Sequence, residues 1–327
     1  MTRAYLLSFL AGIVSALLFA TVNVNFGLAA IVAPFTPVPL YLAGLSLGLR
    51  AALLAGVTAS VLVGLAPGSL HFYGSLMYAA LILGPTALMV RQAVLSRERA
   101  DGAREWYPAG RLLTVLVATM SGLFLLGYGL FAATGEGLLA TLTEMFEATY
   151  QALGSPDAAP GEALPQDAAR ATAEMMVQWM PASLVLGNAI SMLLAHGVLL
   201  RLNKAIRPSL DLMRLELPAA LTYALAGCVL LALLAPGELG LIGRSLALAL
   251  AVAFVFLGLT VVHAFARRLS GGGIIVLILV YGIMLFVIYA AAAIAALGVL
   301  ERWLRLRARA AGSGAAAKGQ SDGRNSA

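Results

Sequence analysis

The amino-acid sequence predicts an all-α polytopic membrane protein, a bundle of about nine transmembrane helices. Three observations predict this class. The chain is 61% hydrophobic and 11% charged, whereas soluble domains carry about 25% charged residues. Its charges are confined to short segments that are separated by long uncharged windows. Each of these windows is long enough for a membrane-crossing helix, which takes about 20 largely apolar residues.

Prolines and glycines divide the apolar windows into separate helices. Pro34, Pro37 and Pro39 cannot lie within one regular helix, because proline lacks an amide hydrogen and disfavours helix at the residue before it. A kink is expected at Gly84-Pro85, inside the fourth helix. The predicted helices cover residues 4–22, 37–49, 51–66, 70–90, 112–134, 179–200, 218–235, 243–266 and 274–300.

The two long polar loops have opposite charge. Residues 91–111 contain five arginines and three carboxylates, whereas residues 135–178 contain seven carboxylates and one arginine. Because basic loops stay in the cytoplasm, the first loop and the N-terminus are expected inside and the second loop outside. Nine helices then place the arginine-rich segment 302–309 outside, against the same rule, so eight spans remain an alternative and the side of the C-terminus stays open.

The outer loop predicts one further helix. Residues 138–153 place apolar side chains on one helical face, opposite Glu144 and Glu147, which predicts an amphipathic helix on the membrane or over the bundle mouth. Residues 154–165 are rich in Pro, Ala and Gly and predict a flexible linker. The chain is thus expected to consist of a six-helix membrane core with its outer loop, additional membrane helices, and a disordered tail; these parts are residues 1–203, 204–309 and 310–327.

Residues that support catalysis are scarce. No Asp or Glu lies within a predicted span, and the three histidines lack the spacing of metal ligands. No phosphate-binding loop or nucleophile elbow is present in the sequence. We therefore expect no enzymatic activity, no catalytic residue, no metal and no cofactor. The net charge of +6 lies in loops and tail, which indicates contact with the lipid bilayer and not with nucleic acid.

Small residues recur at every fourth position of the first helix, at Gly12, Ala16 and Ala20. Residues at i and i+4 share a face, so these three form a shallow groove that another helix can approach closely. We call them the small-residue seam. The approaching helix can belong to this chain, as internal packing, or to a partner protein that docks there.

Polar residues mark a second candidate site. Asn23 and Asn25 interrupt the chain at the predicted outer membrane boundary, where irregular backbone is tolerated when it lines a cavity or is covered by protein. Asn188 lies deep in the sixth predicted helix and needs a hydrogen-bond partner, either another helix or a ligand.

Residues 5–200 resemble the YybS-like family of bacterial membrane proteins, which is related to the substrate-binding (S) subunits of energy-coupling-factor transporters. The resemblance is carried by the small-residue seam, by the segment PFTPVPLYLAGLSLG at residues 34–48, and by the closely spaced helices that follow. It implies the six-helix S-subunit fold in a bacterial cytoplasmic membrane. It also implies that Ala16 and Ala20 dock an energy-coupling transmembrane subunit, and that the first loop closes over a substrate. The candidate ligand contacts are then Asn23, Asn25, Thr36, His71, Tyr73, Tyr78 and Asn188.

Two functions remain open from the sequence. The first is binding of a small molecule from the outer side for uptake with a partner ATPase module. The alternative is a membrane scaffold or assembly protein that has no small-molecule substrate.

Overall fold

The computed structural model describes residues 2–21, 31–66, 72–135, 137–153, 166–269 and 271–309. Most of these residues are helical, as the sequence predicts. The α-helices are α1 (Thr2–Ala20), α3 (Val38–Leu47), α4 (Leu49–Leu65), α5 (Phe72–Tyr78), α6 (Gly84–Ala93), α7 (Ala109–Ala133), α8 (Leu138–Leu153), α9 (Gln166–Arg201), α10 (Ala219–Leu234), α11 (Gly237–Ala266), α12 (Gly273–Phe286) and α13 (Ile288–Leu304). Shorter elements are the 3₁₀ turns η2 (Ala33–Phe35) and η4 (Leu212–Arg214), the π-helical turn η3 (Ala79–Leu83), and the strands β1 (Ser96–Glu98) and β2 (Arg104–Trp106).

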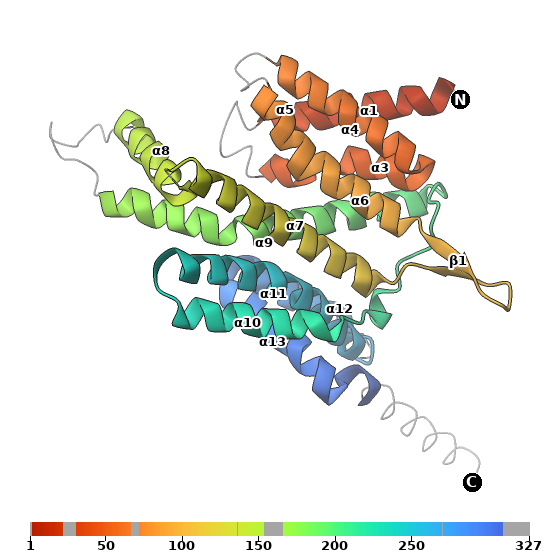
Figure 1. The fold of residues 1–327 in the computed structure, drawn as a ribbon. Helices are drawn as coiled ribbons and strands as arrows, with labels where there is room; N and C mark the ends of the chain where they lie inside the picture. Colours follow the sequence, from red (N-terminus) through yellow and green to blue (C-terminus); the bar gives the residue numbers. More distant parts are fainter. Residues whose placement is uncertain are drawn as a thin grey trace, which may run out of the picture.

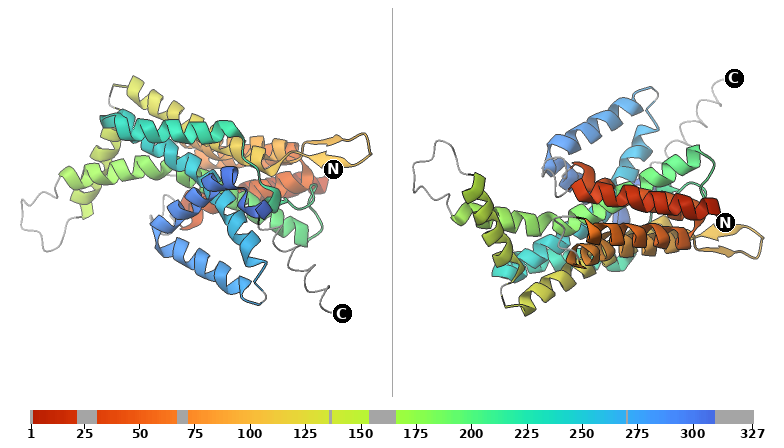
Figure 2. Two further views of the ribbon diagram at one scale, coloured as in Figure 1. Left: turned by 90° about the horizontal axis from the view of Figure 1, so that it is seen from below. Right: turned by 90° about the horizontal axis from the view of Figure 1, so that it is seen from above.

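The helices form three groups that lie side by side. In Figure 1, α1 to α6 lie at the top, α7 to α9 in the middle, and α10 to α13 below them. Both views in Figure 2 place the N-terminus and the β-hairpin at one end of the bundle, with α8 and the start of α9 at the opposite end. Five helical segments are long and apolar enough to cross a membrane, and three shorter apolar helices accompany them in the described part of the chain.

The proline-rich segment behaves as predicted. Pro34 lies in η2, and Pro39 lies in the first turn of α3, where its missing amide hydrogen removes no helical bond. Gly48 alone separates α3 from α4 and has φ +93°, a conformation that glycine adopts without a steric penalty. The two helices predicted at 37–49 and 51–66 are confirmed to within two residues at each end.

The expected kink in the fourth predicted helix takes a specific form. The π-helical turn η3 joins α5 to α6 and ends at Leu83, directly before Gly84-Pro85. Proline cannot donate the backbone hydrogen bond that a continuous helix needs, and a wider turn accommodates this loss. The sequence therefore located the distortion correctly.

The β-hairpin was not predicted within loop 91–111. β1 and β2 are antiparallel, with Ser96 opposite Trp106. Gly102 has φ +77° in the connecting turn, and its amide donates to the carbonyl of Arg99. Asp-Gly is a strong hairpin signal, and Asp101-Gly102 provides it here. The hairpin projects from the end of the bundle (Figure 1).

The predicted outer loop is mostly helical. The amphipathic helix at 138–153 is confirmed as α8, and its apolar side chains pack with Phe124 and Tyr128 of α7 and with Ala173 and Val177 of α9. α9 begins at Gln166, well before the predicted start at residue 179. The apolar face of α8 therefore covers neighbouring helices, whereas the predicted linker at 154–165 lies outside the described residues.

The prediction of one helix at 274–300 was wrong. Val287 is extended, with φ −123° and ψ 102°, and separates α12 from α13. α13 packs closely on α11, because added Cβ atoms at Gly258 and Gly298 would overlap the carbonyl oxygens of Ile294 and Phe254. Contact with α11 thus holds α13 in a direction that a straight continuation of α12 cannot follow.

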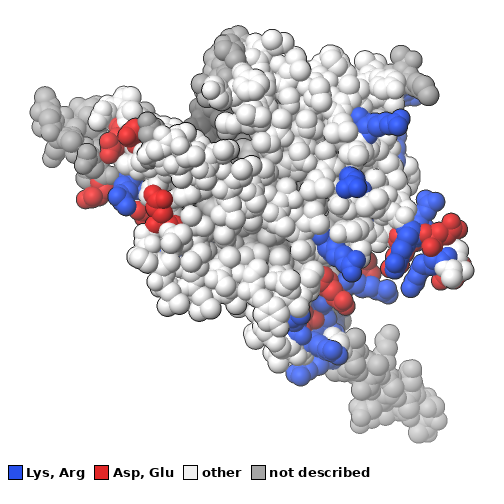
Figure 3. Space-filling model, viewed as in Figure 1, with Lys and Arg blue, Asp and Glu red and all other residues white. Residues whose placement is uncertain are grey.

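Charge separates the two ends of the bundle. Figure 3 shows Lys and Arg gathered at one end of the bundle, together with some Asp and Glu. At the opposite end, around α8 and the start of α9, the visible charged residues are mainly Asp and Glu. We call these the basic end and the acidic end. Side chains of Arg302 and Arg307 donate to carbonyls of residues 213–217, which places the end of α13 beside the basic segment that follows α9. The chain therefore returns to the basic end along α13.

One hydrophobic core crosses the expected division at residue 203. Tyr41 and Val185 from the first part share it with Leu250 and Phe254 of α11, and all four side chains are buried. The expected tail at 310–327 lies outside the described residues.

Candidate functional site

A hydrogen-bonded cluster holds the segment before α3. The Ser15 hydroxyl of α1 donates to the carbonyl of Thr36 at 2.6 Å and therefore accepts from the Tyr78 hydroxyl at 2.5 Å. From the other side, Ser191 of α9 donates to the carbonyl of Pro34 at 2.6 Å. Backbone carbonyls that precede α3 thus receive side-chain donors from two neighbouring helices.

Asn188 continues this cluster on α9. Its Oδ1 accepts from the Tyr41 hydroxyl at 3.3 Å, and its Nδ2 donates to the carbonyl of Leu184 at 3.1 Å. Asn188 is 3% exposed and Tyr41 is fully buried. The Asn188 amide, which was expected to need a hydrogen-bond partner, therefore has one partner on α3 and one on its own helix.

The structure brings together some of the predicted ligand contacts. Thr36 and Tyr78 meet through Ser15, and both are buried. Tyr73 is 67% exposed and contacts the ring of Phe72, so it lies apart from them. Asn23, Asn25 and His71 lie outside the described residues. Within this cluster the polar atoms of Tyr78 and Asn188 contact protein groups, so their roles as ligand contacts stay predictions.

The small-residue seam faces α4. A Cβ atom at Gly12 would overlap the carbonyl oxygen of Ala55 and lie 2.8 Å from the Cβ atom of Thr58. Ala16 is 7% exposed and belongs to a buried cluster with Ala55 and other residues of α4, whereas Ala20 is partly buried. The structure places this face in an internal interface, and docking of a partner helix there stays a prediction.

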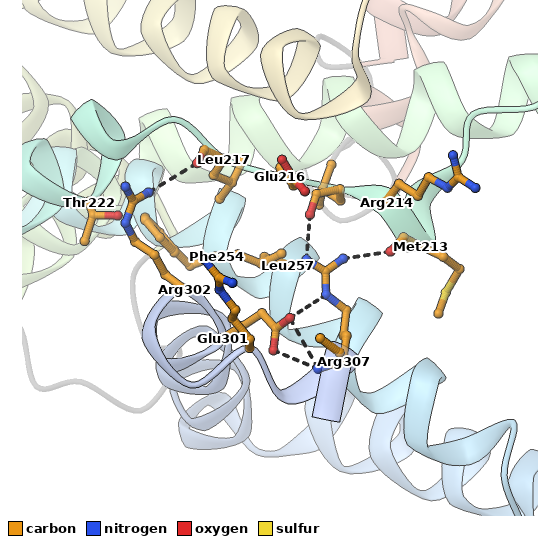
Figure 4. Close-up of a pocket in the computed structure, with 13 residues that line it drawn as sticks. Met213, Arg214, Glu216, Leu217, Thr222, Phe254, Leu257, Glu301, Arg302 and Arg307 are labelled. Atoms are coloured by element: carbon orange, nitrogen blue, oxygen red, sulfur yellow. Dashed lines mark hydrogen bonds and ion pairs between the residues drawn. The ribbon is translucent and has the colours of Figure 1, made fainter. Parts of the chain in front are cut away.

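A pocket of about 670 Å³ opens at the basic end (Figure 4). We call it the basic pocket. Its walls come from the segment around η4, from the start of α10, from α11 and from the end of α13. The lining residues are Met213, Arg214, Leu215, Glu216, Leu217, Thr222, Phe254, Leu257, Glu301, Arg302, Arg305, Arg307 and Ala308.

Arg307 joins two walls of the basic pocket. Its Nε donates to Glu301 Oε1 at 2.7 Å, and its Nη1 and Nη2 donate to the carbonyls of Met213 and Leu215 at 2.7 and 2.9 Å (Figure 4). Arg305 has φ +46° and ends α13, so the chain turns and the side chain of Arg307 reaches back toward Glu301. Glu301 is 6% exposed, and this charge-assisted network satisfies its carboxylate.

Other polar groups of the pocket remain available for a ligand. Arg302 donates to the carbonyl of Leu217 at 3.3 Å, and Arg305 is exposed. The Thr222 hydroxyl is buried and has no hydrogen-bond partner in the structure. Phe254 and Leu257 add an apolar wall. With four arginines against two glutamates, the lining carries a net charge of +2 and can bind an anion that also has an apolar part.

Arg207, which follows α9, is a buried cation near the basic pocket's end of the bundle. Arg207 is 7% exposed, and its Nη1 donates to the carbonyl of Ala93 at the C-terminus of α6. A cation at this position also opposes the partial negative charge of the helix terminus. Burial lowers the pKa of the Arg207 guanidinium.

Sequence reasoning missed the basic pocket. It identified the arginines at 302–309 as a topology signal, and it had no indication that Glu301 and residues 213–217 would meet them. The available signal was Glu301 itself, a carboxylate between a long apolar run and four arginines. In the described residues, no group of three or more His, Cys, Asp or Glu side chains has the geometry of a metal site.

The long apolar helices and their charged ends define an integral membrane protein of the helical-bundle class. The chain belongs to the DUF2232 family of predicted membrane proteins, whose model matches residues 12–301. Because this match is to DUF2232, the resemblance to the YybS-like family and to energy-coupling-factor S subunits stays a prediction. No curated protein and no solved structure was found to match the chain.

Proposed function

We propose that this membrane protein binds a small anionic molecule in the basic pocket, at the cytoplasmic side of a bacterial inner membrane. The observation that carries the proposal is the arrangement of Arg302, Arg305 and the buried Thr222 hydroxyl around one pocket of about 670 Å³. Guanidinium groups and a hydroxyl together suit a phosphate or carboxylate group.

The charge distribution supports the orientation. Lys and Arg gather at the basic end, and short basic segments stay in the cytoplasm (Figure 3). The C-terminal arginines lie at the same end as the segment after α9, so this arrangement removes the conflict that nine spans created. A cytoplasmic basic end also supports a cytoplasmic N-terminus, because α1 begins there (Figure 2).

The apolar wall defines the rest of the ligand. Leu217, Phe254 and Leu257 line the pocket beside the arginines. A ligand with a phosphate group and a short hydrocarbon part would satisfy the arginines and Thr222 and also cover this apolar surface. Inorganic phosphate alone would leave the apolar wall in water, and we expect it to bind more weakly.

Thermal unfolding of the purified full-length protein in mild detergent tests this proposal. The probes are inorganic phosphate, glycerol 3-phosphate and an alkyl phosphate, since a ligand that binds the folded state raises the unfolding temperature. We expect the alkyl phosphate to stabilise the wild type, and we expect Arg302→Gln/Arg305→Gln to weaken its binding roughly tenfold or more.

Arg97→Gln/Arg99→Gln is the matched control, because it removes the same charge from the exposed hairpin at the same end. Equal ligand binding by the pocket variant and the wild type would refute the proposal, as would the absence of stabilisation by all three probes.

Uptake with a partner ATPase module is a wider proposal that rests on the resemblance. The basic pocket supports ligand binding, although it lies at the end opposite to the outer loop. Affinity purification from native membranes tests the wider proposal: an ATPase and its coupling subunit should copurify with the wild type. Their absence from the purified complex would count against uptake. It would not bear on ligand binding, which the thermal unfolding experiment tests separately.

A scaffold is the second candidate function, and the β-hairpin favours it. The hairpin projects beyond the helices, its β1 residues are all exposed, and the Arg104 guanidinium lies 5.9 Å from the centre of the Trp106 ring. Exposed arginines and an aromatic ring are common in protein interfaces. If the hairpin binds a partner, Arg97→Gln/Arg99→Gln should reduce the amount of that partner in the same purification, whereas Arg302→Gln/Arg305→Gln should not.

A further inference from the structure

We propose that a groove between α1, α3 and the end of α9 binds one anionic phospholipid of the leaflet at the basic end. The groove has a volume of about 730 Å³ and is separate from the basic pocket. We call it the α1–α3 groove. Its lining is mostly apolar, with Leu7, Leu10 and Val14 of α1 on one side, and its charged lining residues are Arg3 and Lys204.

The walls of the α1–α3 groove suit a hydrocarbon chain. Leu7, Leu10 and Val14 of α1 are 49%, 47% and 48% exposed, so each presents about half of its surface outward. Pro39 and Ala43 of α3 are buried behind them. The α1–α3 groove therefore has buried residues of α3 on one side and half-exposed aliphatic side chains of α1 on the other, and its volume is not filled by protein side chains.

Charge is confined to one end of the groove. Arg3 and Lys204 are its two charged lining residues, and no carboxylate lines it. Both cations are exposed, and neither forms an ion pair within the described part of the chain. The basic pocket differs in this respect, because Glu216 and Glu301 line it together with its arginines. The groove therefore presents unopposed positive charge to a ligand.

The length of the groove matches a single leaflet. Residues 3–14 of α1 extend about 16 Å along the helix axis at 1.5 Å per residue. One leaflet is half of a hydrocarbon core that is about 30 Å thick, or about 15 Å. An acyl chain beside Leu7, Leu10 and Val14 would thus place its phosphate near Arg3 and Lys204. A free phosphate ion would use the cations and leave the rest of the groove empty.

Native mass spectrometry of the full-length protein in detergent tests this inference. The probes are phosphatidylglycerol and phosphatidylcholine with identical acyl chains, together with glycerol 3-phosphate as a headgroup that has no chains. We expect preferential retention of phosphatidylglycerol, and we expect Arg3→Gln/Lys204→Gln to weaken it roughly 30-fold through the loss of two attractions to the phosphate. Glycerol 3-phosphate should not displace the lipid.

Two further variants separate the possible explanations. Val14→Trp enlarges a half-exposed side chain and should reduce binding of both lipids by filling the groove, while the cations remain. Arg97→Gln/Arg99→Gln should leave phosphatidylglycerol retention unchanged, because these exposed hairpin residues line neither the α1–α3 groove nor the basic pocket. Equal retention of the two lipids, unchanged retention in Arg3→Gln/Lys204→Gln, or displacement by glycerol 3-phosphate would each overturn the inference. A photoreactive group at Leu7 that captures a polypeptide instead of lipid would overturn it as well.

Discussion

At the residue scale, a few buried polar side chains each form more than one hydrogen bond between segments of the structure. Ser15 connects three segments, because its hydroxyl contacts both the Thr36 carbonyl and the Tyr78 hydroxyl. Ser15→Ala leaves two buried polar groups without their partner, whereas Tyr78→Phe removes a donor and leaves Ser15 bonded to Thr36. Buried groups without partners are costly, at about 1–3 kcal/mol each.

We therefore expect Ser15→Ala to destabilise the protein by about 1–3 kcal/mol and Tyr78→Phe to have a smaller effect. Unfolding in a denaturing detergent, followed by circular dichroism, measures both variants. Equal destabilisation by the two would show that the Ser15–Thr36 bond contributes little.

Arg307 allows a second prediction at this scale. Arg307→Met leaves the Glu301 carboxylate, 6% exposed, without its ion-pair partner. Removing one member of a buried pair typically costs about 3–5 kcal/mol, and replacing both members often costs much less. The same unfolding assay should show a large loss for Arg307→Met and partial recovery in Glu301→Gln/Arg307→Met. No recovery in the double variant would mean that the bonds to Met213 and Leu215 carry the effect.

At the element scale, close helix packing depends on glycine. Gly258 of α11 lies against the Ile294 carbonyl of α13, whereas Gly122 of α7 has open space where a side chain would begin. Gly258→Ala should destabilise the protein by about 1–3 kcal/mol through overpacking. Gly122→Ala, the control, should be neutral or slightly stabilising, since alanine favours the helix. Thermal unfolding in detergent compares the two, and similar results for both would contradict the tight contact.

The same scale shows what the sequence could predict. Local signals were sufficient for α3, α4, α8 and the distortion before Gly84, because prolines, glycines and apolar periodicity determine these elements. Asp101-Gly102 was a local signal that was overlooked. The break at Val287 had no such signal, because neither proline nor glycine occupies that position. Contact between α11 and α13 determines the break, and no short stretch of sequence contains this information.

The candidate sites were harder to predict for the same reason. Thr36, Tyr78 and Asn188 were identified individually as polar residues within apolar sequence, and the structure finds them buried. Their partners Ser15 and Tyr41 come from other helices, so the cluster could not be assembled from spacing. The basic pocket depends on the meeting of residues 213–217 with residues 301–307, which are far apart in the chain.

At the scale of the whole molecule, the two ends make a prediction about topology. With the basic end in the cytoplasm, both the N-terminus and Arg309 should lie inside, and the loop before α8 should lie outside. A fluorescent protein fused after Arg309 should fluoresce, and alkaline phosphatase inserted at Gly137 should be active. Phosphatase activity of a fusion after Arg309 would instead support an odd number of spans.

The contact of Arg307 with residues 213–215 also determines when the basic pocket can form during biosynthesis. A ribosome makes the chain from its N-terminus, so η4 and the start of α10 emerge long before Arg307. During that interval the membrane already holds the earlier helices, while the carbonyls of Met213 and Leu215 lack the guanidinium that they bind in the finished protein. The basic pocket is therefore one of the last features to be completed, because Arg302, Arg305 and Arg307 enter the structure only with the final helix.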